Sequence, residues 1–209
     1  EINMLMKVAE NFNFNINTFT HILEGYKVAD KMKLHGVGAS TFSDWWAYKY
    51  EVNDAIPYNA TILNNVGVIT AINSDDAEMS RRLNQEAAKA VKYGGTSEED
   101  AWKMVTLNPA KLLHIDDKIG SIKIGKDADL VLWSGNPLSI YSKAEKTIIE
   151  GSTYFDLKID KKHRANIKNE RNILIQMLLK EKNKGIKTQP IIVKKKQDMH
   201  CDTLDQNEY

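Results

Sequence analysis

Hydrophobic and polar positions along the first 113 residues follow two patterns in alternation, one typical of helices and one typical of short strands. Apolar residues recur every three or four positions over residues 1–11, which predicts a helix. The same spacing predicts further helices over 25–34, 57–65, 78–93 and 96–107. Between them, short runs with β-branched and aromatic residues predict strands over 13–20, 36–41 and 66–72. Strands separated by helices favour a parallel sheet, whose functional groups gather at the carboxyl ends of its strands.

Polar side chains stand where two of these predicted strands end. His21 follows the first of them, and Asn73-Ser74-Asp75 follows the last. The two positions are about two βα units apart, and in a closed barrel the ends of strands two apart both point into the central mouth. The structural alternative is a turn with a helix cap, together with a histidine satisfied in the core. Asp76 competes with Asp75 for the functional role, but it also suits the cap of the next helix.

The pattern changes after residue 118. Short strands are predicted over 119–124, 130–133, 144–149 and 153–155, and their close spacing predicts a small antiparallel β domain. Residues 157–183 are predicted to form a surface helix docked by an apolar stripe made of Ile167, Arg171, Leu174, Ile175 and Leu178. Residues 184–209 lose this periodicity and are predicted to be extended or disordered.

Composition narrows the classes of function. The chain has 209 residues, of which 42% are hydrophobic and 27% charged, enough for the packed core of one large or two small domains. The net charge of +1 argues against a polyanion-binding surface over the whole chain, and the basic residues after 157 are interpreted as a solvated helix face. No apolar run approaches the roughly 20 residues that span a bilayer.

Cysteine usage and the first residue leave the compartment open. The single cysteine, Cys201, excludes an intrachain disulfide and is compatible with either the cytoplasm or a bacterial periplasm. The sequence starts at Glu1 without a methionine or a signal-like segment, so we expect it to begin inside a longer protein.

One motif joins the end of the first part to the β domain. It reads TLNPAKLLHI over residues 106–115 and KIGSIKIGKDADLVL over residues 118–132. Together these stretches resemble the metal-dependent amidohydrolase superfamily, in its imidazolonepropionase- and prolidase-like branch, where the motif runs T-x-N-P-A-K-x-L-G-I and then G-S-I-x-x-G-K-D-A-D-L-V. His114 stands where that family usually has glycine. The resemblance extends over residues 1–155.

The resemblance implies an α/β fold. Residues 1–113 would be the last βα units of a (β/α)8 TIM-type barrel, roughly its sixth to eighth strands with their helices. Residues 114–155 would belong to a small β-sandwich segment. Residues 156–209 would add a charged helix and a disordered tail.

The resemblance also implies a metal site. Thr20-His21 is similar to the superfamily's sixth-strand histidine, and Asn73-Ser74-Asp75 to its eighth-strand aspartate. His21 and Asp75 would bind a divalent metal, zinc by preference, as one or two ions. The metal would supply hydroxide near neutral pH, with Asp75 as the proton acceptor and His21 as a ligand or as the group that orients the tetrahedral oxygen. The superfamily's H-x-H pair, bridging residue and fifth-strand histidine have no match here and are expected before Glu1.

Aromatic residues follow the predicted strand over 36–41. Asp44, Trp45 and Trp46 are predicted either to border the substrate pocket or to fill a seam between the barrel and a neighbouring subunit. His35 and His163 are interpreted as structural or solvated, and the pair His200-Cys201 is a weak metal signal.

These features predict a hydrolase that uses metal-activated water on an amide, cyclic amide or amidine C–N bond. We expect the portion given by residues 1–209 to be inactive by itself. The alternatives are a deaminase of the same superfamily, a non-catalytic piece that serves in folding or assembly, and a nucleic-acid binder that uses the basic tail. The expected partners are a small-molecule substrate, the preceding part of the same protein and a second copy of the chain, with no nucleic acid and no membrane.

Overall fold

A three-stranded parallel sheet organises the first part of the chain. The computed structural model describes residues 1–47 and 49–189. The strands β1 (Thr18–Phe19), β2 (Gly38–Thr41) and β3 (Thr70–Ile72) lie in the order β1-β2-β3. Phe19 pairs with Ala39, and Thr41 pairs with Ile72. This is the parallel sheet that the alternation of strands and helices predicts.

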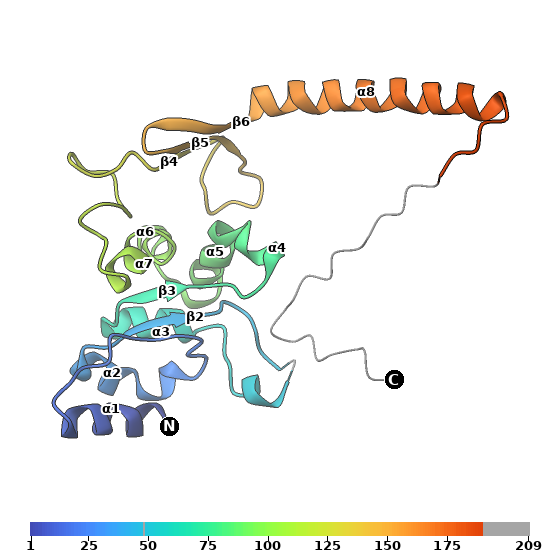
Figure 1. Ribbon diagram of the computed structural model, residues 1–209. Coiled ribbons are helices and arrows are strands. Elements are labelled where there is room, and N and C mark those ends of the chain that lie inside the picture. The colour runs from blue at the N-terminus through green and yellow to red at the C-terminus, as the bar shows by residue number, and fades with distance from the viewer. Residues whose placement is uncertain (48, 190–209) are drawn as a thin grey trace.

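Helices bury the apolar side chains beside this sheet. The helices α1 (Ile2–Asn11), α2 (Ala29–His35) and α3 (Asn59–Val66) share one core, with a 3-10 turn η1 (Gly25–Val28) leading into α2. That core is built from Met6, Met32, Val37, Leu63 and Val68. A second core joins β3 and α3 to α5 (Leu83–Gly94) through Ile72, Ala60 and Ala90. In Figure 1, α1 and α2 lie below β2 and β3, and α5 lies above them.

Several element boundaries differ from those that the sequence pattern predicts. The strand over 66–72 is shorter than predicted, because Val66 still belongs to α3 and Gly67 closes that helix in the left-handed conformation (φ 91°). The helix predicted over 78–93 is two helices, α4 (Ala77–Ser80) and α5. A short 3-10 turn, η2 (Tyr50–Val52), lies within the aromatic loop.

The helix predicted over 96–107 ends early, at Lys103. It is α6 (Glu98–Lys103), and the Ser97 side chain caps its start by accepting a hydrogen bond from the Asp100 N–H. Asn108 and Pro109 lie in the first turn of the next helix, α7 (Leu107–Leu112). Proline is tolerated there because the first turn of a helix needs no donor from its backbone nitrogen.

The second part of the chain contains one antiparallel sheet in the described region. Its strands β4 (Leu130–Trp133), β5 (Ala144–Ile149) and β6 (Ser152–Asp156) lie in the order β4-β5-β6. The strand predicted over 119–124 is absent, and this segment forms turns in which Ile122 and Ile124 are exposed. A strand needs a partner for its backbone groups, and no described strand pairs with this segment. The predicted sandwich is a single sheet here.

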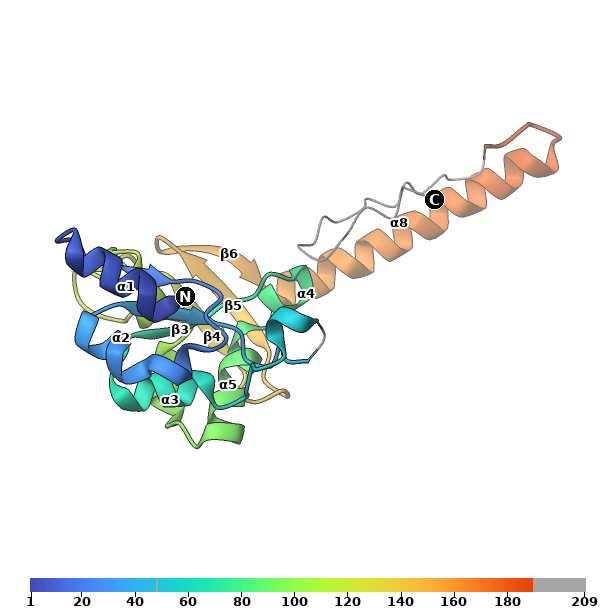
Figure 2. The ribbon, with the colours of Figure 1, turned by 90° about the horizontal axis from the view of Figure 1, so that it is seen from below.

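The last helix, α8 (Leu157–Asn183), projects away from both sheets (Figures 1 and 2). The Asp156 side chain caps its start by accepting hydrogen bonds from the N–H groups of Lys158 and Ile159. The predicted docking of its apolar stripe is wrong, because Ile167 and Leu174 are 63% and 57% exposed. The helix contacts β5 and β6 near its start, where Leu157 and Asp160 are half-buried. His200 and Cys201 lie outside the described residues.

Within the described ranges, no helix combines the length and apolar character needed to cross a membrane.

Gly94 offers a test of the packing between α3 and α5. A Cβ atom at this position would lie 2.5 Å from the Thr61 Cβ, which is closer than real Cβ atoms come to a neighbour. We therefore expect Gly94→Ala to lower the free energy of unfolding by about 1–3 kcal/mol, as overpacking does, although alanine is the better helix former. Chemical denaturation measures this change. Gly135→Ala is the control, since a Cβ there would meet only the Ser142 hydroxyl, and equal stability of the two variants would contradict the packing.

Candidate active site

His21 and Asp75 come together at the carboxyl edge of the parallel sheet. His21 follows β1 and Asp75 follows β3, and their side chains face each other across the end of β2. The His21 Nε2 lies 3.3 Å from the Asp75 Oδ2, and the two side chains are 51% and 24% exposed. An imidazole nitrogen and a carboxylate oxygen thus converge on a point that solvent and small molecules can reach.

The backbone of His21 is held in an uncommon conformation. Its φ of 58° is left-handed, which costs a non-glycine residue of order 1–3 kcal/mol. The flanking backbone supports it, because the Ile22 N–H donates to the Ser40 carbonyl at 3.1 Å and the Leu23 N–H donates to the His21 carbonyl at 2.9 Å. Such strain persists only where the surroundings determine it, and it is common at functional sites.

A stack of three rings fixes the other face of the imidazole. Phe42, which directly follows β2, stacks on His21 with ring centroids 5.2 Å apart and planes 14° apart. Trp45 stacks on Phe42 at 4.4 Å, and its Nε1–H points at the Met79 sulfur, 2.9 Å away on α4. The sequence pattern did not single out Phe42 as a site residue. Its position directly after the strand predicted over 36–41 is the feature that could have indicated it. The stack ties the three strand ends together.

Asp44 and Trp46 turn toward α5. The Lys89 ammonium lies 2.6 Å from the Asp44 carboxylate and 2.7 Å from the Glu86 carboxylate, which is buried. Trp46 makes an edge-to-face contact with Tyr93, with centroids 6.2 Å apart. These contacts anchor the aromatic loop. The role of Asp44, Trp45 and Trp46 in substrate binding stays a prediction.

The environment of Lys89 changes its pKa. Burial alone would lower the pKa of this lysine, but the hydrogen bonds to Asp44 and Glu86 raise it, and the net pKa lies above the usual lysine value. The ammonium is therefore charged at neutral pH and balances two carboxylates.

Asp76 caps α4, as the sequence analysis anticipates. Its Oδ1 accepts hydrogen bonds from the Glu78 N–H at 2.8 Å and from the Met79 N–H at 3.0 Å. The Ser40 hydroxyl donates to the Asn73 Oδ1 at 2.8 Å and so links the ends of β2 and β3. Asp75 and Asp76 are thereby separated, one facing His21 and one capping a helix.

His21 and Asp75 together have the side-chain types of a partial metal site. His21 and Asp75 supply one nitrogen and one oxygen, both suited to zinc. Over residues 1–47 and 49–189, no group of three or more His, Cys, Asp or Glu side chains is placed to hold a metal. The two residues therefore fit as a partial set that needs further ligands.

His35 is structural, as anticipated. Its ring is buried, the Ile16 N–H donates to its Nε2 at 3.2 Å, and its Nδ1 lies 3.1 Å from Glu10.

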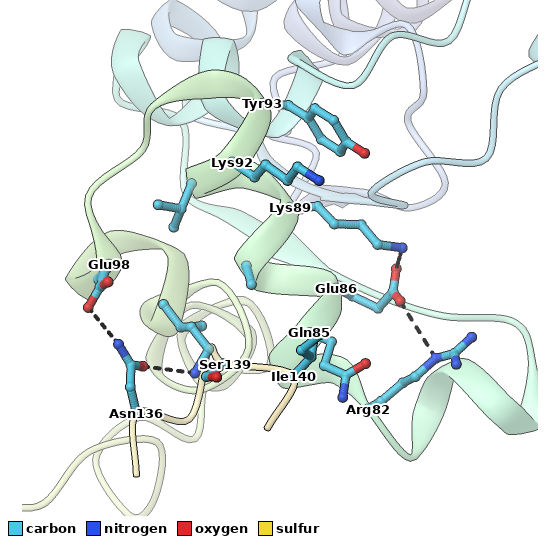
Figure 3. Close-up of a pocket in the computed structure, with 13 residues that line it drawn as sticks. Arg82, Gln85, Glu86, Lys89, Lys92, Tyr93, Glu98, Asn136, Ser139 and Ile140 are labelled. Atoms are coloured by element: carbon cyan, nitrogen blue, oxygen red, sulfur yellow. Dashed lines mark hydrogen bonds and ion pairs between the residues drawn. The ribbon is translucent and has the colours of Figure 1, made fainter. Parts of the chain in front are cut away.

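A cavity of about 620 Å³ lies elsewhere, between α5 and residues 136–140 (Figure 3). Glu86 and Lys89 line one side of it, and Asn136, bonded to Glu98 at 3.0 Å, lies on the other. Neither His21 nor Asp75 lines this cavity. It borders the anchor of the aromatic loop rather than the candidate site.

The parallel strands and the helices beside them form a mixed α/β fold, with His21 and Asp75 at the polar carboxyl edge of its sheet. The chain belongs to the amidohydrolase family, whose sequence model matches residues 52–177. The matched segment includes Asp75 and ends within α8.

Individual relatives agree with this assignment. An amidohydrolase structure from Thermotoga maritima is 34% identical, with a TM-score of 0.68, over 74% of this chain and 40% of that one. Amidohydrolase tasK of Hapsidospora irregularis is 27% identical over 75% of this chain and 16% of its own length. Urease subunit alpha of Laribacter hongkongensis is 30% identical over 43% of this chain and 18% of its own length. An adenosine deaminase from Xanthomonas campestris, with bound zinc, shares the fold at 17% identity and a TM-score of 0.55, over 82% and 46% of the two chains.

The chain therefore spans less than half of the length of these relatives, so the activity of the whole protein is a matter for proposal.

Lys89 provides a test of the loop anchor. Lys89→Met removes the cation and leaves the buried Glu86 carboxylate without it, so we expect the free energy of unfolding to fall by about 2–4 kcal/mol at pH 7. Denaturation followed by tryptophan fluorescence measures this loss. Lys103→Met is the control, because its partners Glu99 and Asp100 are exposed and the loss should stay below about 1 kcal/mol.

The difference in the free energy of unfolding between wild type and Lys89→Met should depend on pH. Because the pKa of Lys89 is raised on folding, its contribution is fully present below the ordinary lysine pKa of about 10.4 and is lost as the pH rises through the folded pKa. A stability difference between wild type and Lys89→Met that persisted unchanged at higher pH would contradict the ion-pair anchor.

Proposed function

We propose that this chain supplies the His21–Asp75 edge of a metal-dependent hydrolase that cleaves an amide-type C–N bond in a small molecule, whether an amide, a cyclic amide or an amidine. The observation that carries the proposal is the 3.3 Å approach of the His21 Nε2 to the Asp75 Oδ2 at the carboxyl ends of parallel strands. Family membership supports it, and so do relatives named amidohydrolase and urease, since both names denote hydrolysis of C–N bonds.

Each residue has a defined part in this proposal. His21 and Asp75 would hold a divalent metal, zinc by preference, together with ligands from the rest of the protein. When bound, such a cation lowers the pKa of the water that it holds. The Asp75 carboxylate takes the proton of the attacking water and delivers it to the leaving nitrogen. The His21 ring, held by Phe42, keeps a fixed orientation beside that carboxylate.

Deamination is the second candidate reaction. The adenosine deaminase of Xanthomonas campestris shares the fold over most of this chain. Attack of water on an amidine-type carbon uses the same carboxylate as a proton shuttle, with ammonia as the leaving group. Hydrolysis of an amide bond ranks first because the likeness to the Thermotoga maritima amidohydrolase includes 34% sequence identity.

The barrel is completed by the rest of the same protein in this proposal. Met4, Leu5 and Val8 on α1 are exposed, and in the described residues β1 and β3 each have one unpaired edge. Both features suit the addition of further βα units. The exposed apolar residues of α8 and the likeness to a urease subunit support assembly with a second copy of the chain.

Neighbouring aspartates give a matched test of the proton shuttle. In the whole protein, we expect Asp75→Asn to lower kcat at least about 100-fold, because an amide cannot accept the proton. Asp76→Asn should keep most of the activity and lose at most about 1 kcal/mol of stability, since asparagine also caps helices. Turnover with chromogenic amides and cyclic amides measures both variants. Near-normal turnover of Asp75→Asn would show that this residue is not the shuttle.

Residues 1–209 by themselves should lack turnover. Two ligands of the roughly four that a zinc site uses give weak zinc binding, which isothermal titration calorimetry measures. We expect no hydrolysis by this portion and full activity in the whole protein. Turnover by the portion alone would refute the assignment of a divided site. An inactive whole protein with intact zinc binding would favour the role in folding or assembly.

A further inference from the structure

Asn59, the first residue of α3, is buried behind the candidate site. The residue is 2% exposed, and its side chain takes part in three hydrogen bonds. The Nδ2 donates to the Ile22 carbonyl at 2.8 Å and to the Thr41 hydroxyl at 2.9 Å. The Oδ1 accepts from the Tyr26 N–H at 2.9 Å. One amide therefore ties α3 to the segment after β1 and to the end of β2.

The partners of Asn59 are the neighbours of the residues that shape the site. Ile22 directly follows His21, and Thr41 directly precedes Phe42, whose ring stacks on the imidazole. Because both segments are held by the same amide, the position of His21 relative to Phe42 depends on Asn59. The left-handed backbone of His21 requires such outside support.

The ordinary role of an asparagine at this point of a helix does not account for it. Asparagine is favoured as a helix cap, yet the cap of α3 is Tyr58 and no side chain makes the capping bond. The Asn59 amide faces the sheet instead. Its combination of two donors and an acceptor is also specific, since aspartate has no donor for Ile22 and Thr41, and leucine would leave all three partners without their bonds.

We propose that Asn59 is a positioning residue for His21. It holds the backbone on either side of the site, so that the imidazole meets Phe42 on one face and Asp75 at its edge, without itself touching the substrate. The effect of Asn59 on catalysis rests on the proposed function. The positioning itself is a property of the chain and is measurable without a metal.

The experiment compares Asn59→Ala with Asn108→Ala in the whole protein. Asn108 is a matched control: it is also buried in the first turn of a helix, and its Nδ2 donates to the Thr70 carbonyl at 2.8 Å, at the start of β3. Both variants lose a buried amide and should lower the melting temperature by several degrees. Only Asn59→Ala should weaken the nuclear Overhauser effect between the His21 and Phe42 rings in the metal-free protein, and only this variant should bind zinc about 10- to 100-fold more weakly.

The outcomes separate the two proposals. An unchanged ring contact in Asn59→Ala, or an equal loss of it in Asn108→Ala, would overturn the positioning role. If His21→Ala binds zinc as well as wild type, the proposed metal function fails, while a lost ring contact in Asn59→Ala still supports the positioning. Should Asn59→Ala not fold, Thr41→Val removes one of its acceptors with little change in shape. It should weaken the same ring contact to a smaller extent, and an unchanged contact there would count against the inference.

Discussion

Parallel pairing of three very short strands is the constraint on which the candidate site depends. The strands have two, four and three residues, so their ladder contains few hydrogen bonds. Their register nevertheless brings the segments that contain His21, Phe42 and Asp75 to the same edge. A slip of one residue would turn every side chain of a strand to the opposite face. The pairing of a histidine with a distant carboxylate is therefore a consequence of strand register.

A ladder this small needs support from the helices, and that support is largely polar. Asn59 on α3, Asn108 on α7 and Lys89 on α5 each reach a strand or the loop that follows it. In the described part of the chain, no buried side-chain nitrogen or oxygen lacks a hydrogen-bond partner. Breaking one such bond leaves a buried group unsatisfied, which costs more than the bond contributes on average. The helices thus hold the sheet and its loops through buried polar contacts as well as through apolar packing.

Local features of the fold could be predicted from the sequence alone. The helices, the cap at Asp76 and the placement of His21 and Asp75 after strands all depend on residues a few positions apart. The family was recognisable from the motif over residues 106–132 for the same reason. The predictions that were wrong depend on contacts with distant segments. In the described residues, the segment 119–124 lacks a neighbouring strand, and the apolar stripe of α8 lacks a surface that covers it.

The sequence by itself thus determined the order of the elements, their amphipathic faces and the two polar residues at the strand ends. Only the tertiary structure decided that Phe42 stacks on His21, that Asp44 turns to Lys89 and that Asn59 holds the site from behind. These contacts join residues 18 to 45 positions apart. Which distant residues meet depends on the register of the sheet and the packing of the helices, and neither leaves a periodic signal along the chain.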